Sequence, residues 1–143
     1  MRVFLCPYEG FSLAVPMDIV QSVIPNRKNP ERTVVYNQEN QNTYISLPRL
    51  FNCANNKIKH GIILKDGIDD KLENKFVLLT YEIESEAELT LNKIYPLPEA
   101  FADMKFALFF KGMIFSDTHP EDLILLVDSE HIVQNIKKEL KND

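Results

Sequence analysis

Short apolar segments recur along the chain, and polar or proline-containing stretches separate them. Residues 3–6 are apolar, a turn containing Gly10 follows, and residues 11–15 alternate between large apolar and small side chains. Alternation with a period of two is typical of a strand with one buried face, and glycine adopts the positive φ of tight turns without strain. The pattern therefore predicts a β-hairpin, which ends at Pro16.

Further segments have the length and apolar character of strands. They cover residues 21–24, 33–36, 44–47, 62–64, 76–79, 109–115 and 123–127, and an extended stretch covers 93–96. The pair 62–64 and 76–79 predicts a second hairpin of buried strands, and 109–115 with 123–127 forms a similar apolar pair. With about eight or nine strands roughly ten residues apart, the spacing favours a β-barrel or a sandwich.

Helical signals are few and concentrate at the C-terminus. Residues 17–22 predict one or two helical turns, and Pro48 suits the first turn of another short helix. Asp128 or Ser129 caps a final helix, whose apolar positions recur at helical spacing: Ile132, Val133, Ile136 and Leu140. The sequence thus predicts a mainly β chain with one C-terminal helix. Its 143 residues suit a single domain over 1–143, with two strand-rich halves that meet near residue 60.

Charge and cysteine content restrict the classes of partner and compartment. The net charge is −5, which argues against a nucleic-acid partner, because such binding depends on Lys and Arg. We interpret the short basic stretches at 57–60 and 137–141 as solvated faces. The chain has no apolar run long enough to span or insert into a membrane, and its N-terminus lacks a secretory signal. Two isolated cysteines give no disulfide framework, so we expect a reduced, cytoplasmic protein.

Candidate catalytic side chains are scattered. The histidines and cysteines are His60, His119, His131, Cys6 and Cys53, and no local motif joins a nucleophile to a base. The spacing typical of a zinc site is absent, and the four glycines are isolated, unlike those of a nucleotide-binding loop. The carboxylates Asp66, Asp69 and Asp70 fit a solvated hairpin tip better than a calcium loop. We therefore expect no enzyme activity, no metal and no cofactor.

Four glutamates alternate strictly along one segment. On a strand they would share one face: Glu82, Glu84, Glu86 and Glu88. Either they form a solvated face or a charged edge strand that resists aggregation, or they form an acidic docking stripe for a basic partner. The first interpretation is the simpler one, because a row of like charges repels itself.

The order of these segments resembles the CheW family of chemotaxis coupling proteins over nearly the whole chain. The matching segments are 11–16, 20–23, 44–52, 76–79, 89–98, 110–113, 123–128 and 132–133. They include Phe11-Ser12-Leu13-Ala14-Val15-Pro16, Ile94-Tyr95-Pro96-Leu97-Pro98 and Phe110-Lys111-Gly112-Met113. Four residues depart from the family pattern: Ser22, Thr43, Ser46 and Tyr81 stand where Glu, Pro, Asp and Asp are usual. A run of amides at 37–42 also replaces the usual turn.

The resemblance implies two small five-stranded β-barrels, packed together, with a C-terminal helix. It implies a non-catalytic adaptor that couples chemoreceptor cytoplasmic tips to the regulatory domain of a CheA-type histidine kinase. By this resemblance Val20, Ser22 and Val23 form a partner-facing segment, although Val20 and Val23 suit a core equally well. Phe106, Phe109 and Phe110 are expected to be mostly core.

Two alternatives remain open. The departures fit a divergent orphan scaffold that has lost receptor docking and binds another signalling protein. A small enzyme or ligand-binding barrel would instead require a pocket with convergent polar groups.

Overall fold

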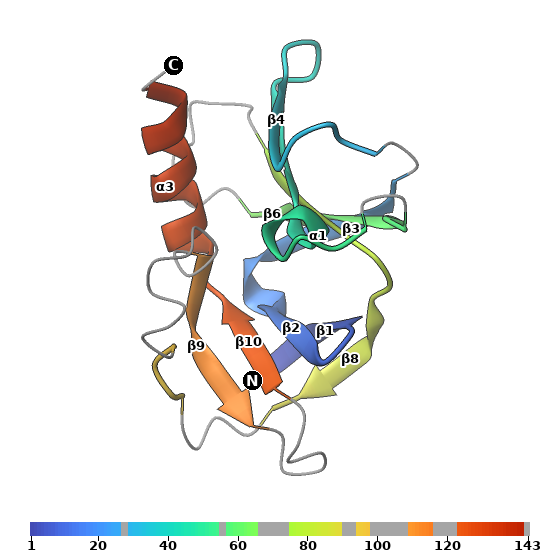
Figure 1. The fold of residues 1–143 in the computed structure, drawn as a ribbon, viewed down its shortest axis with the longest axis vertical. Helices are drawn as coiled ribbons and strands as arrows, with labels where there is room; N and C mark the ends of the chain where they lie inside the picture. The colour runs from blue at the N-terminus through green and yellow to red at the C-terminus, as the bar shows by residue number, and fades with distance from the viewer. Residues whose placement is uncertain are drawn as a thin grey trace. The chain divides into compact units, whose positions relative to one another are not determined.

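The computed structural model describes residues 1–26, 29–54, 57–65, 75–89, 94–97, 109–115 and 123–141. The contacts divide the chain into two compact units (Figure 1). The first unit combines Met1–Asp18 with Glu84–Asp143, and the second unit is Ile19–Ile83. Residue 60, the expected boundary between halves, instead begins a strand inside the second unit, because the N-terminal hairpin pairs with the C-terminal strands.

The first unit contains a five-stranded sheet in the order β8-β1-β2-β10-β9. Its strands are β1 (Arg2–Tyr8), β2 (Phe11–Pro16), β8 (Glu84–Glu88), β9 (Phe110–Phe115) and β10 (Leu123–Val127). The β1–β2 hairpin confirms the first prediction, and Gly10 takes a φ of +87° in its turn. Strand β10 runs parallel to β2 and antiparallel to β9.

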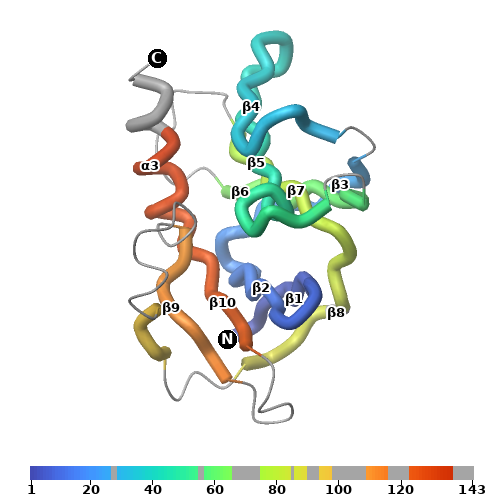
Figure 2. Tube along the Cα trace, in the orientation of Figure 1, coloured from blue at the N-terminus to red at the C-terminus, as the bar shows by residue number. Residues whose placement is uncertain are grey.

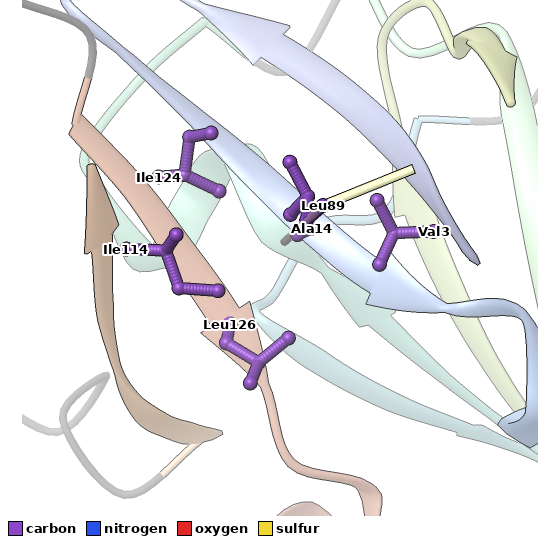
Figure 3. Close-up of a cluster of buried hydrophobic side chains, with 6 residues drawn as sticks. All are labelled: Val3, Ala14, Leu89, Ile114, Ile124 and Leu126. Atoms are coloured by element: carbon purple, nitrogen blue, oxygen red, sulfur yellow. The ribbon is translucent and has the colours of Figure 1, made fainter. Parts of the chain in front are cut away.

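A group of buried apolar side chains fills the interior of the first unit. Figure 3 shows six of them: Val3, Ala14, Leu89, Ile114, Ile124 and Leu126. Phe109 and Phe110 are also buried, as predicted, whereas Phe106 lies outside the described residues.

Helix α3 (Ser129–Lys141) follows β10, as the sequence predicted. Asp128 is its cap, because Oδ1 of Asp128 accepts hydrogen bonds from the backbone N–H groups of Glu130 and His131 at 3.0 and 3.4 Å. The apolar positions Ile132, Val133 and Ile136 are buried. The side chain of Leu140 lies outside the described part of the chain.

The second unit contains another five-stranded sheet, in the order β3-β6-β7-β5-β4. Its strands are β3 (Val20–Pro25), β4 (Val34–Asn37), β5 (Asn42–Ser46), β6 (His60–Leu64) and β7 (Phe76–Thr80). The predicted pairing of residues 62–64 with 76–79 is present as β6 against β7. Figure 2 traces the path of these strands along the chain.

Short helical turns in or beside the second unit differ in part from expectation. The turn predicted over 17–22 is only a 3-10 turn, Met17–Ile19, because strand β3 already begins at Val20. Helix α1 (Leu47–Leu50) follows β5, has Pro48 in its first turn as expected, and is capped by the Ser46 side chain.

The two sheets share one pattern of strand pairing. Read from β8 to β9 in the first and from β3 to β4 in the second, the pairs are antiparallel, antiparallel, parallel and antiparallel. In both, a helix follows the fourth strand of that order, α3 after β10 and α1 after β5. The expectation of a mainly β fold with two five-stranded halves and a C-terminal helix is confirmed.

Candidate protein-binding edge

Strand β3 contains all three residues predicted to face a partner. It lies at one end of the sheet in the second unit, and among the described strands it pairs only with β6. Val20 is half-buried, Ser22 is exposed, and Val23 is 38% exposed. Val23 is therefore not a core residue of the described structure, which leaves it accessible to a partner.

Ile24 belongs to the same surface, although the sequence analysis did not single it out. It is 37% exposed, beside Val23. Neighbouring strand residues point to opposite faces, so Val23 and Ile24 present apolar groups on both sides of β3. The available sequence signal was the adjacent pair of aliphatic residues, but such a pair occurs equally in a buried strand.

The backbone of β3 is irregular where the strand begins. The register against β6 shifts between Val20 and Ser22, which marks Gln21 as the extra residue of a β-bulge. The Gln21 side chain is held in place, because its Oε1 accepts a hydrogen bond of 2.9 Å from Nζ of Lys75. Bulges of this kind re-aim side chains at sheet edges.

The hydrogen-bond pattern shows which backbone groups of β3 face outward. The Asn26 N–H donates to Lys59 O at 2.9 Å, and in an antiparallel ladder such bonds recur at every second residue. Ser22 and Ile24 therefore direct their backbone groups toward β6, and Val23 directs its N–H and C=O to the open side. Pro25 has no N–H, so it limits how far a further strand can extend along this edge.

No ionisable side chain occurs between Val20 and Pro25. The segment is therefore an exposed strand edge with apolar side chains and without charge. Such an edge can accept a strand or an apolar surface from another protein, because the covering chain need not desolvate an ion.

The acidic stripe lies at the end of the other sheet. Strand β8 is the outermost strand beside β1, and Glu84, Glu86 and Glu88 are all exposed. Glu86 forms an ion pair with Arg2 of β1. Glu82, which precedes the strand, belongs to the second unit and pairs with Lys59 at 2.9 Å. That hydrogen bond, together with the lysine charge, holds the pKa of Glu82 below its usual range.

The departures from the family pattern occupy different environments. Thr43 and Ser46 are buried, and Ser46 caps α1, so both act inside the second unit rather than on its surface. Tyr81 is half-buried, and its hydroxyl donates a hydrogen bond to Ala54 O. Burial raises the pKa of Tyr81, and the nearby Cys53 thiol adds to the effect. Of the four departures, Ser22 lies on the candidate edge.

The candidate catalytic residues are dispersed. Cys6 is buried in β1, and Cys53 is half-buried. His131 forms a 2.8 Å contact with Asp128 at the start of α3, and His60 begins β6. His119 and the carboxylates at 66, 69 and 70 lie outside the described residues. Within the described ranges, no three His, Cys, Asp or Glu side chains gather as a metal site.

The two sheets and the helix after β10 define a mainly β protein with a CheW-like fold. A crystal structure with this fold is that of the scaffolding protein TtCheW from Thermoanaerobacter tengcongensis, which matches with a TM-score of 0.61. The match covers 90% of this chain and 84% of that one at 14% sequence identity, so the likeness concerns the fold. No family model matches the chain, and no curated protein matches its sequence. In the part of the chain that the structure describes, every helix is too short or too polar for a membrane span.

Proposed function

We propose that this chain is a non-catalytic adaptor of chemotaxis signalling, which couples chemoreceptor tips to a CheA-type histidine kinase. The fold supports this role, since a scaffolding protein shares it. The observation that carries the proposal is the exposed, uncharged edge of β3, which contains Val20, Ser22 and Val23. The contact on the kinase is its regulatory domain.

The proposed contact combines backbone hydrogen bonds between strands with the burial of apolar side chains. Val23 offers the outward N–H and C=O to a strand of the partner, while Val23 and Ile24 are covered on the two faces of β3. Micromolar binding requires about −8 kcal/mol. Two half-exposed aliphatic side chains supply at most about 2 kcal/mol of that, at roughly 25 cal/mol per Å² of apolar surface. The interface therefore extends beyond β3 to roughly 1,200 Å² or more in total.

A second candidate is an orphan scaffold with the same fold, which no longer docks receptors and binds another signalling protein. Ser22 favours it, because this exposed residue replaces the glutamate usual in the family at the proposed contact. Without that charge, the edge suits an uncharged partner surface better than a basic one.

Titration calorimetry against the regulatory domain of the CheA-type kinase from the same cell tests the first proposal. We expect binding at micromolar strength or tighter, about −8 kcal/mol or more favourable. In Val23→Asp, a carboxylate would be buried in the contact, so we expect affinity to fall at least tenfold. The matched control is Tyr36→Asp on β4, the opposite edge of the same sheet, where Tyr36 is 41% exposed.

The possible results of this titration support different functions. Binding that Val23→Asp weakens and Tyr36→Asp does not would support the adaptor and its edge. Equal losses in both variants would contradict the β3 contact. No detectable heat at two temperatures, with both proteins folded, would reject coupling to the kinase and favour the orphan scaffold.

A further inference from the structure

Pro25 is the last residue of strand β3, at the open edge of the second sheet. It is exposed and lies opposite His60 of β6, one residue before Asn26, whose N–H donates to Lys59 O. Because backbone groups alternate along an antiparallel ladder, residue 25 directs its own groups away from β6, as Val23 does. Proline therefore costs the β3–β6 ladder no hydrogen bond, but it removes a donor from the open side.

The rest of this edge has no protection by charge. Strand β3 lacks ionisable side chains, and Val23 and Ile24 are exposed aliphatic residues. Strand edges of this kind pair with copies of themselves unless a local feature prevents it. The register shift between Val20 and Ser22 interrupts the edge at its start, so regular pairing with a further strand is confined to residues 22–25.

Two copies of the chain can be aligned along this stretch with Ile24 of one copy opposite Ile24 of the other. Val23 of each copy then lies opposite Pro25 of the other, and the aliphatic side chains of the two copies face one another. Each Val23 N–H can donate to a Pro25 C=O. Each Val23 C=O instead faces a proline nitrogen that has no proton, so two of the four hydrogen bonds of this register are missing. The register with Val23 opposite Val23 brings Pro25 against the bulged Gln21 and again lacks its donor.

The missing donors make pairing between copies unfavourable. A carbonyl that is removed from water without a donor costs more than a formed hydrogen bond contributes, so the two unsatisfied Val23 carbonyls outweigh the two bonds that form. A strand of another protein avoids this penalty. It makes both hydrogen bonds with Val23 when any residue other than proline lies opposite, and it loses nothing at Pro25 if it ends before that residue.

We propose that Pro25 is a specificity-determining residue of the β3 edge, which excludes a second copy of this chain and leaves the edge to a strand of a different protein. The identity of that protein rests on the function proposed above, whereas the exclusion of a second copy does not.

Pro25→Val in the full chain tests this exclusion, because it restores the donor that faces outward. Sedimentation velocity should show a concentration-dependent dimer, with a dissociation constant at least tenfold below the highest concentration at which the wild type is still a monomer. Amide hydrogen exchange at residues 23 and 25 should slow as the concentration of the variant rises. Exchange at Ile24, whose N–H faces β6, should change little.

Two further variants separate the donor from the added side chain. Ser22→Val places valine in the same strand at a residue whose N–H faces β6, so this variant should remain a monomer. Val23→Pro combined with Pro25→Val removes the other outward donor, so the double variant should also be a monomer.

Three results would overturn the proposal. They are a Pro25→Val variant that is folded and monomeric at every concentration, a dimer that persists in the double variant, and equal dimerisation of Ser22→Val. All samples contain this chain alone, so the outcome is independent of the titration against the kinase domain. Failure of that titration would reject the kinase as the partner without changing the role of Pro25.

Discussion

Strands β3 and β8 hold the same position in two sheets with the same pairing pattern, yet their surfaces are opposite in character. Each is the end strand beside an antiparallel hairpin, β6–β7 for β3 and β1–β2 for β8. Strand β3 has no ionisable side chain, whereas β8 carries exposed glutamates at alternate positions. Since the topology is matched, the difference lies in the side chains and not in the architecture.

This difference separates an edge that is available for binding from one that is protected. A charged strand edge resists pairing with other chains, because a covering strand would bury the charges. Strand β8 also uses its glutamates within the unit, since Glu86 pairs with Arg2. Strand β3 lacks charged side chains, and its bulge and Pro25 restrict further pairing to a short length.

The largest effect we expect is on the free energy of unfolding, which should depend much more on the core residue Ile62 than on its neighbour Val23 at the edge. Val23 and Ile62 are paired across β3 and β6, and Ile62 is completely buried. Ile62→Ala should lower the free energy of unfolding by about 2–5 kcal/mol, through lost burial and a cavity. Val23→Ala should lower it by less than about 1 kcal/mol, because much of its surface is already in water. Urea denaturation measures both, and equal losses would show that Val23 serves the fold and not a partner.

The next prediction concerns a variant in which the charged edge of β8 is made apolar. Replacing Glu84, Glu86 and Glu88 with valine gives β8 the apolar, uncharged character of β3. We expect the variant to self-associate in sedimentation velocity at concentrations where the wild type stays dispersed, because the repulsion and desolvation cost are gone. The matched control replaces the same three residues with lysine and should stay dispersed. A dispersed valine variant would mean that the glutamates do not protect β8.

Much of the fold could be predicted from the sequence, because its signals are local. The alternation of residues 11–15, the glycine turn and the capped apolar periodicity of α3 each appear within a few residues. The division into units could not be predicted, since it depends on β10 returning to lie parallel to β2, a pairing more than a hundred residues apart in sequence.

The candidate site could be predicted from the sequence less well than the fold. Val23 and Ile24 are adjacent aliphatic residues that would also suit a buried strand, and they are exposed in a strand that lies at the end of its sheet. The exposure of Glu84, Glu86 and Glu88 on β8 was easier to predict, because charges at alternate positions of a strand face solvent or a partner. The sequence gives no sign that residue 112 must be glycine, since Ile94 and Tyr95, which leave no room for a side chain there, are brought near by the fold.

The smallest effect concerns the glutamate at the start of the stripe. Glu82 is tied to Lys59, so its charge is neutralised locally and should add little to the repulsion along β8. In Lys59→Ala the pKa of Glu82 should rise toward its ordinary value, as followed by NMR titration of its side-chain carboxyl signal. A lowered pKa contributes stability at neutral pH that is lost as the pH falls through it, so this small, salt-sensitive contribution should be absent in the variant. Lys57→Ala, which removes a nearby lysine from the same sequence cluster, is the control and should leave the pKa unchanged. An unchanged pKa in Lys59→Ala would mean that the ion pair does not persist in solution, and Glu82 would then belong with the repelling charges that protect β8.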